Sequence, residues 1–130
     1  METNSSPVIL ILEDEALIAI DLELTLHNAG FEVVWFTHCT KADEWLESNS
    51  PSFAVIDIAL VDGICVKAAS VLAQRQIPFI VHSGDTEFSE HRDTIFVAGL
   101  WIGKPAKNDD LVLIVQELIE LTHPAKQWLA

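Results

Sequence analysis

The sequence predicts a single α/β domain, in which a parallel β-sheet is covered by helices on both faces. Short apolar blocks alternate with amphipathic segments of helical length, which is the pattern of successive βαβ units. The blocks are apolar at nearly every position, as expected for strands that are buried on both faces. The length of 130 residues is typical of one domain. We therefore expect five strands to alternate with five helices.

The first strand is predicted at residues 8–12, which form a continuous apolar run before an acidic cluster. A helix follows over 16–29, and Gly30 is suited to the position that ends it. The apolar residues of this helix form two neighbouring stripes, namely Leu17, Ile20 and Leu24, and Ile18, Leu22 and Leu26.

The middle of the chain continues the alternation. A second strand is predicted at 31–35 and a second helix at 40–48, after which the polar segment 49–52 breaks the helix. The third strand, 53–58, is apolar throughout except for Asp57. Such an isolated carboxylate inside a buried strand is either a structural group with a charged partner or a functional one.

The last third of the chain supplies the remaining elements. A third helix is predicted at 64–75 and a fourth strand at 79–81. The segment 87–93 has weak helical periodicity and is expected to form a short helix. A fifth strand at 100–103 precedes a final helix at 109–121, whose first residues are acidic and suit its N-terminal dipole.

The charge balance excludes several classes of protein. The chain contains seven Lys and Arg residues and 20 Asp and Glu residues, which gives a formal net charge of −13. A chain this acidic repels phosphate backbones and anionic lipid headgroups, so we expect neither nucleic-acid nor membrane binding. No apolar run approaches the roughly 18 residues of a membrane span. The polar first residues do not resemble a signal peptide, and we expect a cytoplasmic location.

The two cysteines, Cys39 and Cys65, have no CxxC spacing and no nearby histidine pair of the kind that binds zinc. We therefore expect them to be free, buried thiols.

The polar residues that end the predicted strands are the candidates for chemistry. They are Glu13 and Asp14 after the first strand, Asp57 in the third, Ser83 after the fourth and Lys104 after the fifth. In an open parallel sheet the functional crevice lies beyond these carboxyl ends. Three crowded carboxylates repel one another unless a cation neutralises them, and Mg²⁺ prefers such oxygen ligands. A carboxylate also accepts phosphoryl groups, whose oxygens an ammonium and a hydroxyl stabilise.

The order and spacing of these motifs resemble the receiver domains of two-component response regulators. The matching segments cover nearly the whole chain: 10–15, 55–60 with Asp62 and Gly63, 82–84 and 103–105. The resemblance implies a flavodoxin-like, doubly wound sheet of strand order 2-1-3-4-5. It implies a receiver domain over 8–122, flanked by a disordered tail at 1–7 and a C-terminal tail at 123–130.

The same resemblance implies residue roles. Asp57 would accept a phosphoryl group from the phosphohistidine of a histidine kinase or a phosphotransfer protein. Asp14 and Asp57 would contact Mg²⁺ directly, Glu13 would do so through water, and the backbone carbonyl of Ala59 would add a ligand. The only reactions catalysed would be the chain's own phosphorylation and dephosphorylation, so it would not be an enzyme in the usual sense.

The resemblance also implies a conformational switch. Ser83 and Lys104 would bind the phosphoryl oxygens, and Ser83 would act together with Trp101, which occupies the family's switch position. We expect no effector domain after the last helix, and we therefore expect the output to be a contact with a downstream protein. The fifth strand and the last helix, which carries Leu113, are also the expected surface for a homodimer.

Two other functions remain open on the sequence. One is a Mg²⁺-dependent phosphohydrolase with an aspartyl-phosphate intermediate, although Ala59 stands where such enzymes place a second aspartate. The other is a pseudo-receiver that binds proteins without being phosphorylated.

Overall fold

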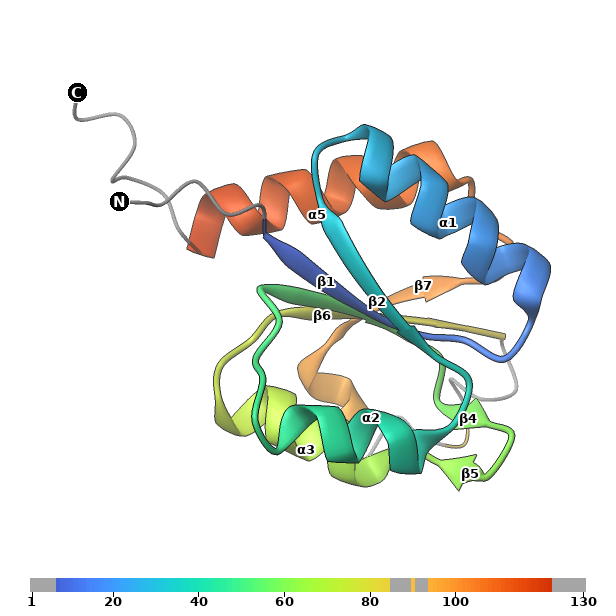
Figure 1. Cartoon of the computed structure of the whole chain (residues 1–130), viewed down its shortest axis with the longest axis vertical. Coiled ribbons are helices and arrows are strands. Elements are labelled where there is room, and N and C mark those ends of the chain that lie inside the picture. The colour runs from blue at the N-terminus through green and yellow to red at the C-terminus, as the bar shows by residue number, and fades with distance from the viewer. Residues whose placement is uncertain (1–6, 85–89, 91–93, 123–130) are drawn as a thin grey trace.

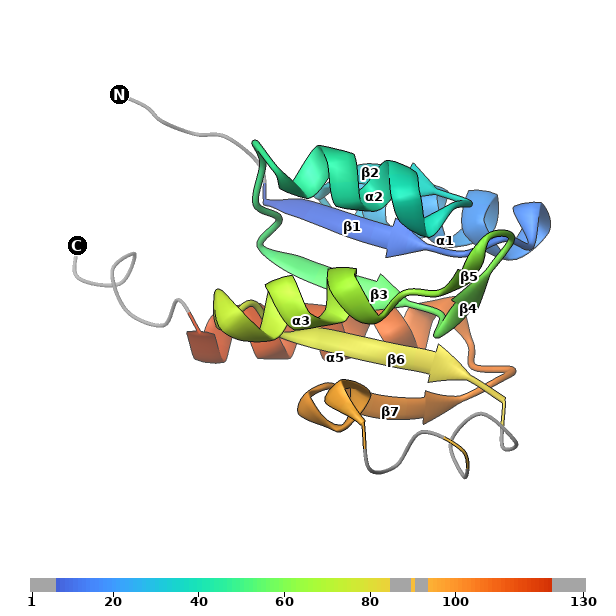
Figure 2. The same cartoon turned by 90° about the horizontal axis from the view of Figure 1, so that it is seen from below.

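A five-stranded parallel sheet lies between two layers of helices in the computed structural model, which describes residues 7–84, 90 and 94–122 (Figure 1). The strand order is β2-β1-β3-β6-β7, which confirms the predicted order 2-1-3-4-5. Figure 2 shows the strands pointing in one direction. The strands are β1 Val8–Leu12, β2 Glu32–Phe36, β3 Phe53–Ile56, β6 Phe79–Ser83 and β7 Leu100–Gly103.

The helices divide between the two faces of the sheet. Helices α1 and α5 cover one face, and α2 and α3 cover the other (Figure 1). Their bounds are α1 Ala16–Asn28, α2 Cys39–Leu46, α3 Val66–Gln74 and α5 Asn108–Thr122, with a 3₁₀ helix, η1, at Ile95–Ala98. The helix predicted at 87–93 falls on residues of which only Glu90 is described, and residues 1–6 and 123–130 of the predicted tails also lie outside the described part.

Each strand of the sheet centre contributes to two separate cores. Leu10 and Leu12 of β1 pack with residues of α2 and α3, whereas Ile9 and Ile11 pack with residues of α1 and α5. All four residues are at most 1% exposed. Because successive side chains of a strand point to opposite faces, two buried faces explain why these strands are apolar at every position.

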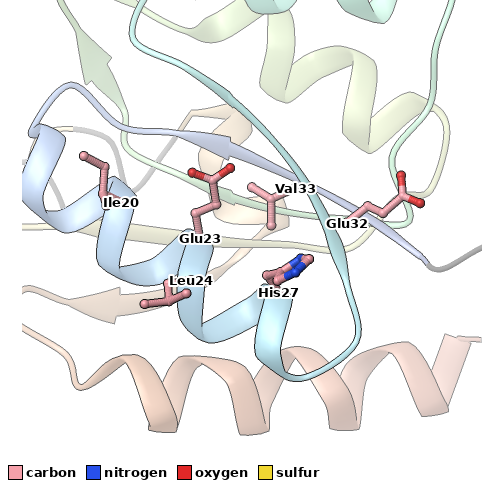
Figure 3. A pocket seen from close by; sticks show the side chains of 6 residues that line it. All are labelled: Ile20, Glu23, Leu24, His27, Glu32 and Val33. Carbon is pink, nitrogen blue, oxygen red and sulfur yellow. The ribbon is translucent and has the colours of Figure 1, made fainter.

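The two apolar stripes of α1 differ in burial. Leu22 and Leu26 belong to the core, whereas Leu17 is 86% exposed and Ile20 and Leu24 are each more than half exposed. Ile20 and Leu24 border a shallow cavity of about 530 Å³ between α1 and β2 (Figure 3). None of the predicted site residues lines this cavity, so it is separate from the strand ends.

A short hairpin follows β3 and was not predicted. Strand β3 ends at Ile56, and two-residue strands at Ala59–Leu60 (β4) and Gly63–Ile64 (β5) pair in antiparallel fashion. Gly63 has a φ of +131°, a backbone conformation that favours glycine. The hairpin lies at the carboxyl edge of the sheet (Figure 2). Strands of two residues are too short to show a periodic pattern, which is why the sequence did not reveal them.

The prediction of free thiols was wrong, because Cys39 and Cys65 form a disulfide. Cys39 begins α2 and Cys65 directly precedes α3, and these two helices pack on the same face of the sheet. Their N-terminal ends converge and bring the two Cα atoms to 5.2 Å, a usual separation for a disulfide. Sequence spacing carries no signal of this approach.

In the described ranges, no helix combines the length and the hydropathy that crossing a membrane requires.

Replacement of Gly99 by alanine is expected to destabilise the fold by about 1–3 kcal/mol, as overpacking usually does. A Cβ at Gly99 would lie 2.5 Å from two ring atoms of Phe79 and 2.9 Å from its carbonyl oxygen. Phe79 is buried in the core and its backbone belongs to β6, so neither its ring nor its carbonyl group can move freely. Urea unfolding measures the change. The control is Gly84→Ala, where a Cβ meets nothing within 4 Å; an equal loss in both variants would contradict this account.

Candidate functional site

The predicted site residues from four different strands meet at the carboxyl edge of the sheet. Glu13 and Asp14 follow β1, Asp57 follows β3, Ser83 ends β6 and Lys104 follows β7. Carboxylate oxygens of Glu13, Asp14 and Asp57 lie within 4.8 Å of one another. Glu13, Asp57 and Ser83 are buried, whereas Asp14 is exposed to solvent. The site is therefore an acidic cluster with one open side.

Asp57 is held at the centre of this cluster. Its backbone N–H donates to the carbonyl of Leu12 at 2.9 Å, which continues the pairing of β1 and β3 beyond their last residues. Its Oδ1 accepts the hydroxyl of Ser83 at 3.1 Å, and its Oδ2 lies 2.9 Å from Nζ of Lys104. Each carboxylate oxygen thus has its own partner, one neutral and one cationic.

Glu13 is the second buried carboxylate, and both its side chain and its backbone are held by hydrogen bonds. Its Oε1 lies 3.1 Å from Nζ of Lys104, and its Oε2 accepts the N–H of Glu15 at 3.1 Å. The indole N–H of Trp35 donates to the Glu13 carbonyl at 2.7 Å. Burial raises the pKa of Glu13, and the charge of Asp57 adds to this rise, against the hydrogen bond from Glu15 and the charge of Lys104.

Lys104 bridges the two buried carboxylates. Burial alone would lower the pKa of its ammonium, but the hydrogen bond and charge of Asp57, together with those of Glu13, raise it above the ordinary value. The Lys104 N–H donates to the carbonyl of Ser83 at 3.1 Å, and the Lys104–Pro105 peptide bond is cis. The site therefore holds a protonated ammonium between Glu13 and Asp57.

The donor set fits a magnesium ion. Glu13, Asp14 and Asp57 offer three hard carboxylate oxygens within reach of one ion, and Mg²⁺ is bound through such ligands with water completing its shell. A divalent cation would also offset the repulsion and the burial that raise the pKa of Glu13. Ala59, predicted to add its carbonyl, begins β4 on the loop that follows Asp57.

Ser83 and Trp101, the residues predicted to act as a switch, lie on neighbouring strands. The hydroxyl oxygen of Ser83 accepts the N–H of Ile58 at 3.4 Å in addition to donating to Asp57. Trp101 is partly buried against the core, and its indole N–H donates to the carbonyl of Phe96 in η1 at 3.0 Å. Their part in a switch stays a prediction.

Two residues that touch the site were not predicted. Trp35 positions the backbone of Glu13 through the hydrogen bond from its indole N–H. His82 is 4% exposed and precedes Ser83 on β6. Burial, followed by the positive charge of Lys104, lowers the pKa of His82, while Asp57 opposes this shift. A histidine in an apolar strand next to a site residue was the available signal.

The lowered pKa of His82 predicts a pH-dependent stability. Above the ordinary value of 6.5, the imidazole of His82 is neutral in both the folded and the unfolded chain. The contribution of the buried neutral imidazole to the free energy of unfolding is then fully present. As the pH falls below 6.5, the unfolded chain takes up a proton that the folded chain resists, and the free energy of unfolding decreases by up to about 1.4 kcal/mol per pH unit. Urea unfolding between neutral and mildly acidic pH measures this slope.

His82→Gln should remove that part of the slope, whereas His27→Gln, at an exposed position of α1, should leave it unchanged. Equal slopes in wild type and His82→Gln would contradict the assignment.

No protein-family model matches the sequence. Solved structures of other proteins, however, have a similar fold. A CheY-like response regulator receiver domain protein from Methanospirillum hungatei is similar with a TM-score of 0.77 at 23% identity, over 92% of this chain and 98% of that one. A response regulator receiver protein from Sinorhizobium medicae has a TM-score of 0.75 at 25% identity, over 91% and 98% of the two chains.

The receiver domain of a sensor histidine kinase from Pseudomonas aeruginosa, which has a magnesium ion in its active-site cleft, has a TM-score of 0.74 at 21% identity, over 88% of this chain and 98% of that one. The strand order of the sheet is the one expected for a receiver domain, and the similarity to these structures extends over about nine-tenths of the chain. The chain therefore has the fold of a response regulator receiver domain.

Proposed function

We propose that this chain is a phosphorylation-dependent switch of two-component signal transduction, with Asp57 as the phosphoacceptor. The observation that carries the proposal is the position of Asp57. It lies between the hydroxyl of Ser83 and the ammonium of Lys104, with two further carboxylates close by. A structural carboxylate needs one charged partner to be buried, whereas this arrangement supplies a nucleophile, a cation and a hydroxyl donor together.

The proposed reaction is phosphoryl transfer from a phosphohistidine of a histidine kinase or a phosphotransfer protein. A carboxylate oxygen of Asp57 forms a bond to phosphorus while the bond from phosphorus to the histidine nitrogen breaks, which leaves an acyl phosphate on Asp57. Lys104 and Ser83 stabilise the charge on the transferring oxygens. Glu13, Asp14 and Asp57, with the carbonyl of Ala59, would hold Mg²⁺, which supplies further positive charge when bound.

The residue at position 59 argues against a phosphohydrolase. Rapid hydrolysis of an aspartyl phosphate needs an acid or base beside the nucleophile, and Ala59 has no titratable group. The acyl phosphate would then persist long enough to signal. The intact acidic cluster likewise argues against a pseudo-receiver that binds proteins without phosphorylation.

The output would be a protein contact controlled by the phosphorylated state. A phosphoryl group on Asp57 would attract the hydroxyl of Ser83, and Trp101 on the adjacent strand would respond. Leu113 on α5 is 57% exposed and Leu100 on β7 is 46% exposed, which gives these two elements apolar surface for a downstream partner or a second copy. A histidine kinase partner would place the domain in the cytoplasm.

Incubation with Mg²⁺ and a small phosphodonor, acetyl phosphate or phosphoramidate, tests the proposal. Intact mass spectrometry should show the addition of one phosphoryl group, and chelation of the metal should suppress it. No gain of mass with either donor would overturn the proposal. Steady release of phosphate from small phosphate esters would instead favour the phosphohydrolase.

A further inference from the structure

The Cys39–Cys65 disulfide encloses the segment that follows the proposed phosphoacceptor. Residues 57–65, here called the β3–α3 loop, run from Asp57 through the β4–β5 hairpin to Cys65. The disulfide joins the end of this loop to the first residue of α2. Both cysteines thus lie at the carboxyl edge of the sheet, on the loop side of the acidic cluster.

Hydrogen bonds hold the same loop against the start of α2. The carboxylate of Asp62 accepts the N–H of Cys39 at 2.7 Å and the N–H of Thr40 at 3.1 Å. The N–H of Val61 donates at 3.3 Å to the carbonyl of Thr37, which lies two residues before α2. Within the loop itself, the N–H of Cys65 donates to the carbonyl of Ile58 at 2.9 Å. The disulfide is therefore a covalent addition to a contact that the loop makes without it.

The surroundings suit the dithiol as well as the disulfide. Sγ of Cys39 lies 3.4 Å from the carbonyl oxygen of Gly63. The disulfide has no S–H to donate across this distance, but a reduced Cys39 would have one. In addition, Cys39 and Cys65 stand at the N-terminal ends of α2 and α3, and helix N-termini stabilise thiolates. A reduced Cys39 therefore has a hydrogen-bond acceptor already in place for its thiol.

We propose that Cys39–Cys65 is a redox-active disulfide whose reduction by a dithiol loosens the β3–α3 loop and thereby weakens phosphorylation of Asp57. The effect on Asp57 rests on the proposed function. In the cytoplasm that this function implies, protein disulfides are usually transient and regulatory rather than structural. The process that such a disulfide would regulate is phosphorylation of Asp57, which lies at the start of the same loop.

The reaction is a thiol–disulfide exchange. A thiolate of the dithiol attacks Sγ of Cys39, the disulfide breaks and Cys65 leaves as a thiolate. The second thiol of the reductant then displaces Cys39 and becomes part of the reductant's own disulfide, so two electrons and two protons pass to the two cysteines.

Access to the sulfur depends on movement of the hairpin. Cys39 is 7% exposed and Cys65 1%, so the sulfur of Cys39 is the one to be attacked. The hairpin that lies beside it has two-residue strands, and Val61 and Ile64 are 63% and 45% exposed. Leu60 anchors the hairpin in the core. The exposed side chains beyond Leu60 have few buried contacts, so this part of the hairpin opens at a lower cost in free energy than the core strands. Oxidation would limit this opening, and reduction would permit it.

The test uses the whole chain in its oxidised and reduced forms. Alkylation with iodoacetamide, read by mass, should modify no cysteine in the oxidised form and two after treatment with dithiothreitol. Hydrogen exchange at the amides of Val61 and Cys65 should become at least about tenfold faster on reduction. Phosphorylation by phosphoramidate should become about fivefold slower, which corresponds to a barrier raised by about 1 kcal/mol.

The double variant Cys39→Ser/Cys65→Ser is the matched control, because it should behave as the reduced form under both conditions. If that variant does not fold, the comparison of oxidised and reduced wild-type protein tests the proposal. Failure of the disulfide to form with oxidised glutathione, or equal amide exchange in both forms, would overturn the proposal. Equal phosphorylation rates in both forms would overturn its effect on Asp57. If amide hydrogen exchange differs between the oxidised and reduced forms but neither form is phosphorylated, the proposed function is overturned. The proposal of a redox-active disulfide would still hold.

Discussion

Replacement of Asp57 by asparagine is expected to abolish phosphorylation by acetyl phosphate or phosphoramidate. The asparagine amide has nearly the same shape, but it lacks the carboxylate that would form the bond to phosphorus. Its side-chain oxygen still accepts the hydroxyl of Ser83, so the fold should persist. Intact mass spectrometry after incubation with Mg²⁺ measures the result.

The matched control is Asp110→Asn, because Asp110 is exposed on α5 and does not belong to the cluster of Glu13, Asp14 and Asp57. This variant should gain a phosphoryl group as the wild type does. An equal gain by Asp57→Asn, with circular dichroism showing a folded chain, would contradict the assignment of Asp57.

Replacement of Lys104 by alanine is expected to lower both stability and the rate of phosphorylation. Lys104 is the cation between Glu13 and Asp57, whose side chains are 4% and 8% exposed. Its loss leaves two buried carboxylates without this partner, which typically costs about 3–5 kcal/mol. Loss of a donor to the transferring oxygens should slow phosphorylation about 100-fold or more.

Urea unfolding with and without Mg²⁺ measures the stability part of this prediction. Magnesium should stabilise Lys104→Ala more than the wild type, because it replaces part of the missing charge. Without Mg²⁺ the variant should also regain stability as the pH falls through the raised pKa of Glu13, since protonation of that carboxyl removes a buried charge.

Lys107→Ala provides the comparison for Lys104→Ala, because Lys107 is exposed on the same segment. It should change neither stability nor rate. A Lys104→Ala variant as stable as Lys107→Ala in the absence of Mg²⁺ would show that the ammonium does not offset the buried carboxylates.

The sheet and the convergence of the site residues could be predicted because local sequence determines both. Leu10 and Ile11 of β1 face opposite cores, and only a strand covered on both sides requires apolar residues at each position. Parallel strands also place their carboxyl ends at one edge, so the last residue of each strand is a candidate for the site. Asp57 was conspicuous because it interrupts an apolar block.

The features that escaped prediction depend on tertiary contacts. The two apolar stripes of α1 have similar residues, and the packing of α5 decides that Leu22 is buried and Leu24 exposed. The disulfide depends on how α2 and α3 lie against each other, and the hydrogen bond from Trp35 to Glu13 depends on the pairing of β1 and β2. None of these distances is encoded in the spacing of the residues involved.

The most direct test of the central claim is to locate the phosphoryl group on the chain. Phosphorylation in the presence of Mg²⁺, followed by borohydride reduction, converts an aspartyl phosphate to homoserine, which peptide mass spectrometry identifies by position. We predict homoserine at position 57 and at no other aspartate. Phosphorylation of a histidine, a serine or another aspartate such as Asp14, with position 57 unmodified, would contradict the account.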